Sequence, residues 1–192
     1  LCIGCGLGMG PHSEELLKKV LENNKTPAVI DADGLNLLAK TGEWGIEQIR
    51  MNPSGYVLTP HMKEMSRLTG YSVQELKDNR RELLRKYTEK VHAVCVLKDS
   101  RTLVKAPEGR LMINTTGNAA MAKAGSGDVL AGMITGLMAQ HMRPDDAAVL
   151  GVYLHGLCGD HARKELGSYS VLAGDLLKML GRTLKELEDM TE

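Results

Sequence analysis

The chain contains the stretch Gly117-Asn118-Ala119-Ala120-Met121-Ala122-Lys123-Ala124-Gly125-Ser126-Gly127-Asp128, in which small residues lead into an aspartate and an apolar segment. Small residues let backbone N–H groups approach an anion, and a helix N-terminus adds free donors and partial positive charge. Asp128 stands where a carboxylate can take a proton from a hydroxyl beside a bound phosphate. Phosphoryl transfer needs this combination. A plain glycine-rich turn, with Asp128 as a helix cap, is the structural alternative.

An apolar stripe with helical spacing follows the glycine loop. Its members recur at i, i+3, i+4, i+7 and i+8 and are Leu130, Met133, Ile134, Leu137 and Met138. This spacing predicts a helix with one buried face. Small residues lie off the stripe and predict close packing on another side: Ala131, Gly132 and Gly136.

Strand and helix signals alternate along the rest of the chain. Apolar runs predict strands at Ala28–Asp31, Tyr56–Thr59 and Ala93–Leu97, and the chain opens in what resembles the end of another strand. Two further runs, Thr102–Lys105 and Arg110–Asn114, flank Pro107-Glu108-Gly109 and predict a hairpin.

Helix signals lie between and after these runs. One helix is predicted to begin near Leu35, and a second runs from His61 to about Thr69. A third runs from a Ser72/Glu75 capping box to about Val91, and a fourth begins at Pro144. Two shorter helices are predicted near Leu172–Leu180 and Leu184–Met190. Alternating strands and helices with a late hairpin predict a three-layer α/β/α domain whose central sheet is mostly parallel. Ligands in such folds bind at the carboxyl ends of the strands, where the polar motifs of this chain fall.

Composition narrows the function classes. The 192 residues suffice for one sizeable core, and 24 Lys and Arg balance 24 Asp and Glu, which gives no electrostatic case for nucleic acid or an anionic membrane. Aromatic residues make up only 3%, so a base-stacking platform is not expected. No apolar run reaches the roughly 20 residues of a membrane span. No leader precedes the first loop, and a cytoplasmic location is expected.

The cysteines leave one alternative open. Cys2 and Cys5 have the spacing of a metal or redox pair, yet no second pair with zinc spacing accompanies them. Reduced, unpaired thiols are the ordinary state of the cysteines in a cytosolic protein.

Five ordered segments carry a family resemblance, namely Gly4–Gly8, Val29–Leu38, Leu58–Met65, Val96–Thr102 and Thr116–Ile134. Together they resemble the ADP-dependent NAD(P)H-hydrate dehydratases, a branch of the ribokinase-like kinases, over nearly the whole chain. The resemblance implies a ribokinase-like fold. Residues 1–192 would form a single domain of this type lacking its N-terminal portion, because the family has a further third upstream of Gly4. Departures are Cys5 for proline, and Lys123 and Ala124 where threonine and glycine are frequent.

The resemblance also implies roles for individual residues. The hydrated dinucleotide would be bound by Gly6, Gly8, His61 and Asp128, with Asp128 as the catalytic base. The nucleotide would be bound by Lys98, Asp99, Ser100, Arg101 and Thr102 together with Gly125, Ser126 and Gly127. Carboxylates that could hold magnesium through water are Glu64, Asp31 and Asp33, and the two aspartates could equally cap the helix near Leu35. No functional role is expected for His12, His92, His141, His155 and His161.

The implied reaction is repair of a damaged cofactor. The S epimer of hydrated NADH or NADPH would be dehydrated with ADP as co-substrate and Mg²⁺ as cofactor, giving NAD(P)H, AMP and phosphate. By analogy with the family, we expect a homo-oligomer, a tetramer in many members, and an NAD(P)H-hydrate epimerase domain in the full-length protein. Two alternatives remain: a ribokinase-like kinase of a small alcohol such as a vitamin precursor, and a non-catalytic nucleotide-binding remnant.

Overall fold

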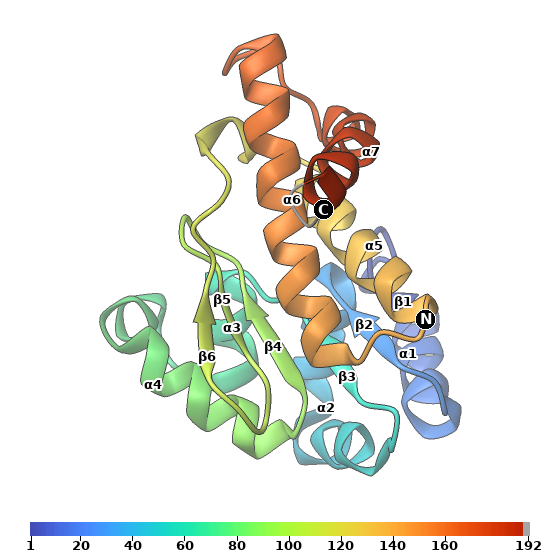
Figure 1. The fold of residues 1–192 in the computed structure, drawn as a ribbon. Helices are drawn as coiled ribbons and strands as arrows, with labels where there is room; N and C mark the ends of the chain where they lie inside the picture. Colours follow the sequence, from blue (N-terminus) through green and yellow to red (C-terminus); the bar gives the residue numbers. More distant parts are fainter. Residues whose placement is uncertain (190–192) are drawn as a thin grey trace.

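A six-stranded sheet forms the centre of the computed structural model, which describes residues 1–189 (Figure 1). Its strands follow chain order: β1 (Cys2–Ile3), β2 (Ala28–Ile30), β3 (Tyr56–Leu58), β4 (Val94–Leu97), β5 (Leu103–Lys105) and β6 (Leu111–Ile113). β1 to β4 pair in parallel, whereas β4, β5 and β6 pair antiparallel. The predicted sheet and its late hairpin are confirmed.

Helices cover both faces of the sheet. One layer comprises α1 (Pro11–Asn23), α2 (Ala32–Met51), α3 (Met62–Thr69) and α4 (Val73–Val91). The other comprises α5 (Ser126–Ala139) and α6 (Pro144–Leu166), and α7 (Ala173–Asp189) packs against α5 and α6 (Figure 1). A short 3₁₀ turn, Ala119–Met121, lies inside the small-residue loop. The predicted three-layer architecture is confirmed.

The parallel strands β2, β3 and β4 are buried on both faces, as their uninterrupted apolar sequence requires. Because side chains alternate along a strand, Val29, Val57 and Val96 pack under α5 and α6. Their neighbours Ile30 and Leu58 point to the layer of α1 to α4. Because helices cover both faces of these strands, polar functional residues are expected at the strand ends.

Several boundaries differ from the sequence-based expectation. α2 begins at Ala32, three residues before Leu35. The two short C-terminal helices are one helix, α7, because its buried side continues past Gly181 from Leu176 to Thr183; Met190 lies outside the described residues. α1 was not predicted at all, although Pro11 stands at its first turn.

The glycines of α5 also correct an expectation. Leu130, Met133, Ile134 and Met138 are buried and Leu137 partly so, which confirms the stripe. Ala131 is buried as well. Gly132 and Gly136, in contrast, are exposed, and a Cβ on either would meet no atom within 4 Å. These two glycines therefore do not permit a close helix contact among residues 1–189.

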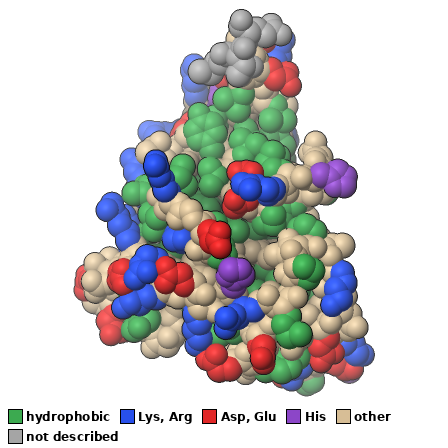
Figure 2. Space-filling model, turned by 60° about the horizontal axis from the view of Figure 1, so that its bottom comes forward, with side chains coloured by type: hydrophobic (Ala, Val, Ile, Leu, Met, Phe, Trp, Pro, Cys, Tyr) green, Lys and Arg blue, Asp and Glu red, His purple; other side chains and the backbone are tan. Residues whose placement is uncertain are grey.

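Surface charge is mixed. Figure 2 shows acidic and basic side chains interspersed over one face, with hydrophobic side chains between them. This distribution accords with the equal numbers of acidic and basic residues in the sequence. Among the helices that the structure describes, each is too short or too polar to cross a bilayer.

Candidate active site

Backbone hydrogen bonds join the carboxyl ends of the parallel strands into one edge. The Asp31 amide donates to the Ile3 carbonyl at 3.1 Å, and the Thr59 amide donates to the Ile30 carbonyl at 3.2 Å. The Lys98 amide donates to the Pro60 carbonyl at 2.8 Å. The motifs after β1, β2, β3 and β4 are therefore neighbours, as the parallel topology predicts.

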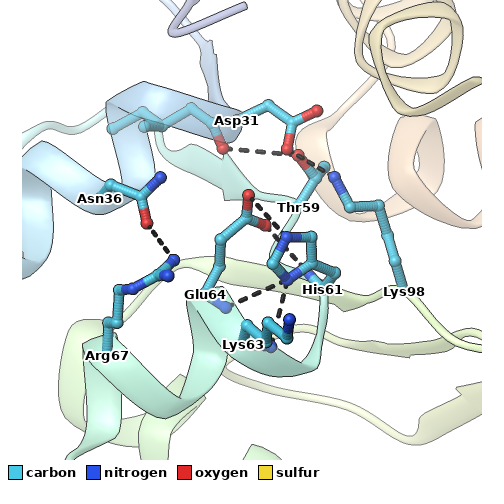
Figure 3. Close-up of polar contacts among 9 residues, drawn as sticks. Asp31, Asn36, Thr59, His61, Lys63, Glu64, Arg67 and Lys98 are labelled. Carbon is cyan, nitrogen blue, oxygen red and sulfur yellow. Dashed lines mark hydrogen bonds and ion pairs between the residues drawn. The ribbon is translucent and has the colours of Figure 1, made fainter. Parts of the chain in front are cut away.

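A buried ion pair lies at the middle of this edge. Asp31 is 1% exposed, and its Oδ1 is 2.6 Å from the Lys98 Nζ (Figure 3). Asp31 occupies the N-cap position of α2 but makes no side-chain cap bond, because its carboxylate is turned to the lysine. In a low-dielectric setting each charge needs the other, since an unpaired one would be strongly destabilising.

The start of α5 lies directly over this ion pair. A Cβ on Gly127 would stand 3.3 Å from the Lys98 Nζ and 3.7 Å from the Asp31 Oδ2, so a larger residue here would crowd the lysine. The N-cap residue Gly125 has φ +86°, a left-handed conformation that glycine adopts without strain. Within residues 1–189, the Gly127 and Asp128 amides have no hydrogen-bond partner.

Asp128 occupies the first turn of α5 and is exposed to solvent. Its carboxylate, the Asp31 carboxylate and the Cys5 thiol have ligand atoms within 4.8 Å of one another. Burial, then a hydrogen-bonding contact with Asp128 and the charge of Asp31, raises the pKa of the Cys5 thiol to about 12. Cys5 is thus a neutral thiol beside two acids, and its reactivity as a thiolate is suppressed.

His155, for which no role was expected, is hydrogen-bonded to Ser126, the first residue of α5. Its Nε2 lies 3.0 Å from the Ser126 carbonyl and 3.3 Å from the Ser126 hydroxyl, and it donates to the carbonyl. Burial lowers the pKa of His155 to about 4, the hydrogen bond to Ser126 opposes the shift, and the charge of Lys98 adds to it. The imidazole ring is therefore neutral at pH 7, and its hydrogen bond to Ser126 stabilises the first turn of α5.

The preceding part of the loop is fastened to α6. Asp160 accepts from the Gly117 amide at 2.9 Å and from the Asn118 side chain at 2.8 Å. Gly156 and Gly159 make room for the loop, because a Cβ on either would lie within 2.1 Å of a loop side chain. Sequence reasoning missed these three α6 residues. A signal was present in the glycines spaced along an otherwise apolar helix.

His61 and Glu64 form the start of α3. The His61 Nδ1 accepts from the amides of Lys63 and Glu64, each at 3.1 Å. The Glu64 carboxylate accepts from the His61 amide at 2.8 Å and lies 3.3 Å from the His61 Nε2 (Figure 3). This reciprocal pair is a capping box. An isolated parallel β-bridge pairs the His61 backbone with that of Lys98. The His61 side chain is exposed, so one face of the ring is accessible to a ligand.

The first glycine loop is tied to α2. The Gly8 amide donates to the Asp33 Oδ2 at 2.9 Å, which holds the loop after β1 against the first turn of α2. Gly6 is exposed, and a Cβ there would meet no atom within 4 Å. The predicted substrate glycines therefore lie on the same edge as Asp128.

The Lys98–Thr102 turn reaches the other side of the loop. Asp99 pairs with Arg80 at 3.0 Å, and its other oxygen accepts from the Ser100 amide. The Thr102 hydroxyl donates to the Asp99 carbonyl. Arg101 donates to the Thr115 carbonyl at 3.2 Å, which links this turn to the small-residue loop.

The family model for NAD(P)H-hydrate dehydratase matches residues 1–182. The chain belongs to the NAD(P)H-hydrate dehydratase family. A relative, the bifunctional NAD(P)H-hydrate repair enzyme of Moorella thermoacetica, is 44% identical over 197 aligned positions that cover 100% of this chain. The ADP-dependent (S)-NAD(P)H-hydrate dehydratase of Bacillus subtilis is 39% identical and covers 98% of it. The chain spans 36% of the first relative's length and 64% of the second's.

Solved structures that this chain resembles have the same fold. The ADP/ATP-dependent NAD(P)H-hydrate dehydratase from B. subtilis, co-crystallised with ATP and Mg²⁺, superposes with a TM-score of 0.82 at 34% identity, over 96% of this chain and 63% of that one. A ribokinase-like superfamily protein from Enterococcus faecalis gives a TM-score of 0.80 at 32% identity, over 96% of this chain and 62% of that one. The predicted ribokinase-like fold and family are confirmed.

The three carboxylates expected to hold magnesium through water each make one contact within the protein. Asp33 accepts from the Gly8 amide, Glu64 caps α3, and Asp31 pairs with Lys98. Among them, Asp31 also lies close to a second carboxylate, that of Asp128. A buried carboxylate beside an exposed one fits a hydrated Mg²⁺ that keeps most of its water, whereas the Cys5 thiol is not a ligand for this hard cation.

Proposed function

We propose that this domain dehydrates the S epimer of hydrated NADH or NADPH, with ADP as phosphoryl donor. The observation that carries the proposal is the placement of Asp128. An exposed carboxylate stands in the first turn of α5, beside the open Gly127 amide and above the Lys98 cation. A base, hydrogen-bond donors for phosphate oxygens and a positive charge at one point suit phosphoryl transfer.

The proposed reaction has two steps. Asp128 removes the proton of the hydroxyl at C6 of the hydrated ring, and that oxygen attacks the β-phosphorus of ADP. A new O–P bond forms as the bond to the bridging oxygen breaks, so AMP leaves. The nitrogen lone pair of the ring then expels phosphate from C6, and loss of a proton from C5 restores NAD(P)H. Water supplies no atom in this sequence, and ADP ends as AMP and phosphate.

Each neighbour of Asp128 has a function in this proposal. The Gly127 and Asp128 amides and the amino end of α5 stabilise charge on the transferring phosphoryl group. The Lys98–Thr102 turn, together with Gly125 and Ser126, binds the adenine nucleotide. Gly6, Gly8 and His61 hold the hydrated ring. Mg²⁺, held through water by Asp31 and Asp128, would neutralise charge on the phosphates of ADP.

The relatives support the substrate and the context. Both names specify NAD(P)H-hydrate, and that of the B. subtilis relative specifies ADP dependence. The bifunctional relative from Moorella extends well beyond the part that this chain covers. We therefore include in the proposal an epimerase domain elsewhere in the full-length protein. A homo-oligomer, a tetramer by analogy, and a cytoplasmic location stay part of the same proposal.

The test is recovery of absorbance at 340 nm, about the maximum of the reduced nicotinamide band, from purified hydrate with ADP and Mg²⁺. We expect ADP-dependent recovery by the wild-type chain and loss of at least about 100-fold in rate in Asp128→Asn, because a general base contributes about that much. Asp146→Asn is the matched control, since Asp146 is an exposed first-turn aspartate of α6 that pairs with Arg143.

Product analysis separates the alternatives. AMP and phosphate formed in equal amounts with NAD(P)H support the proposal. A phosphorylated small alcohol with no NAD(P)H would identify a kinase instead. A folded chain that binds ADP and restores no NAD(P)H would indicate the non-catalytic remnant.

A further inference from the structure

A surface hollow lies beside the candidate active site, between the first glycine loop and helices α2 and α3. Its lining is Met9, Asn36, Ala39, Lys40 and Arg67. Met9 directly follows the Gly8 loop, and Asn36 and Arg67 lie about one turn beyond Asp33 and Glu64 on their helices. In Figure 3 the Asn36–Arg67 pair lies on the opposite side of Glu64 from Lys98. The hollow therefore extends the site away from Asp128.

The hollow combines an apolar floor with two cations. Met9, 41% exposed, and Ala39 supply apolar surface. Arg67 donates to the Asn36 side-chain oxygen at 2.7 Å, and neither Arg67 nor Lys40 has a carboxylate within ion-pair distance in the described structure. Most other lysines and arginines of α1 to α4 whose ion pairs are recorded, such as Lys18 and Arg85, pair with acids on their own helix.

A helix terminus adds to this positive field. Gly10, the residue after Met9, is the N-cap of α1 and has no side chain to satisfy the first-turn amides. Lys40 lies close to this first turn, since its charge contributes, after Lys18, to lowering the pKa of Glu14. Two cations thus line one apolar surface, and a 13-residue helix begins two residues after Met9, with Glu14 the acidic residue of its first turn.

We propose that this hollow binds the distal half of the dinucleotide substrate, with a phosphate between Arg67 and Lys40 and a base or ribose against Met9 and Ala39. This inference rests on the proposed function, which sets the hydrated ring beside Asp128. Guanidinium and ammonium groups bind phosphate oxygens with charge-assisted hydrogen bonds, and flat apolar rings pack on methionine and alanine. Arg67 and Lys40 would then determine affinity for the dinucleotide without touching the reacting atoms.

The experiment measures binding rather than turnover. NADPH and NADH, intact reduced dinucleotides that differ from the substrate only at the ring, are titrated by nicotinamide fluorescence into wild type, Arg67→Met and Lys40→Met. We expect each variant to weaken NADPH binding about fivefold to tenfold, as loss of one charge-assisted contact implies. Arg67→Lys should recover most of the affinity. Lys19→Met is the control, because Lys19 carries the same charge on α1 but pairs with Glu15.

The two dinucleotides identify the phosphate. A loss confined to NADPH assigns the 2′-phosphate to the hollow, whereas equal losses for NADPH and NADH assign the pyrophosphate. The subsite is wrong if Arg67→Met and Lys40→Met bind like Lys19→Met, if ADP affinity falls in parallel, or if wild type binds neither dinucleotide. A wild-type chain without ADP-dependent recovery but with Arg67-sensitive binding would overturn the proposed function and leave the subsite standing.

Discussion

Two helices that begin at the carboxyl edge of the sheet start in opposite ways. At α3, His61 accepts from two first-turn amides and Glu64 accepts from the His61 amide, so the helix satisfies its own donors. At α5 the N-cap is Gly125, which has no side chain, and the first-turn amides lie above the Asp31–Lys98 pair. A helix start that lacks its own cap and stands beside a cation is where an anion gains most. The contrast supports the α5 start, more than the number of glycines, as the place where we propose that phosphate binds.

Among the effects on the free energy of unfolding, we expect the largest from His155, which is hydrogen-bonded to the first turn of α5. His155 is held neutral, with a pKa of about 4 against 6.5 in the unfolded chain, so the unfolded state binds the extra proton between these values. Its contribution is full above pH 6.5 and is lost as pH falls toward 4, by roughly 3 kcal/mol at most. We expect His155→Gln to flatten the pH dependence of the free energy of unfolding in that window.

Chemical denaturation at a series of pH values between 4 and 7 measures this effect. His12→Gln is the control, since His12 is exposed on α1. If the slopes of wild type and His155→Gln agree, His155 does not support the loop as described.

The left-handed N-cap of α5 gives the next effect. Gly125→Ala places a Cβ at φ +86° and 3.2 Å from the Ala173 Cβ, so we expect a loss of about 1–2 kcal/mol in unfolding free energy. Gly132→Ala, in the same helix with open space around it, should stabilise by up to about 1 kcal/mol. Opposite signs at the two glycines confirm that only Gly125 is required by conformation; equal signs contradict it.

The N-cap of α3 gives the smallest expected effect on the free energy of unfolding. It also distinguishes a capping role of His61 from a substrate-binding role. His61→Ala removes the acceptor of two amides and should lower unfolding free energy by about 1 kcal/mol, whereas His61→Asn, also a good cap, should retain stability. If His61 also binds the hydrated ring, both variants raise KM for the hydrate. An Asn variant with wild-type stability and wild-type KM would leave His61 as a cap alone.

Local and strand-based features could be predicted from sequence. The Ser72/Glu75 capping box is present at α4, and the strand ends after Ile30 and Leu58 meet as parallel topology requires. These features depend on short-range patterns and on one topological rule, so tertiary contacts were not needed to find them.

The parts that were missed depend on contacts between distant residues. The Lys98–Asp31 pair joins positions 67 apart, and no local pattern reports it. His155 contacts Ser126 from a neighbouring helix, a relation invisible to helical spacing rules. Gly156 and Gly159 accommodate a loop that precedes them by about 40 residues, and their function becomes clear only when α6 and the loop are seen together.

The hydrogen bonds that link the strand ends have a mechanical consequence. Because the Asp31, Thr59 and Lys98 amides donate to residues at the ends of neighbouring strands, the residues that would meet substrate are continuous with the sheet ladder. Local opening follows such ladders, and groups bonded into them share the free energy of the whole unit. Local opening at the edge that carries the candidate site should therefore require loosening of the central sheet, and motion of the surface loops alone should leave its geometry unchanged.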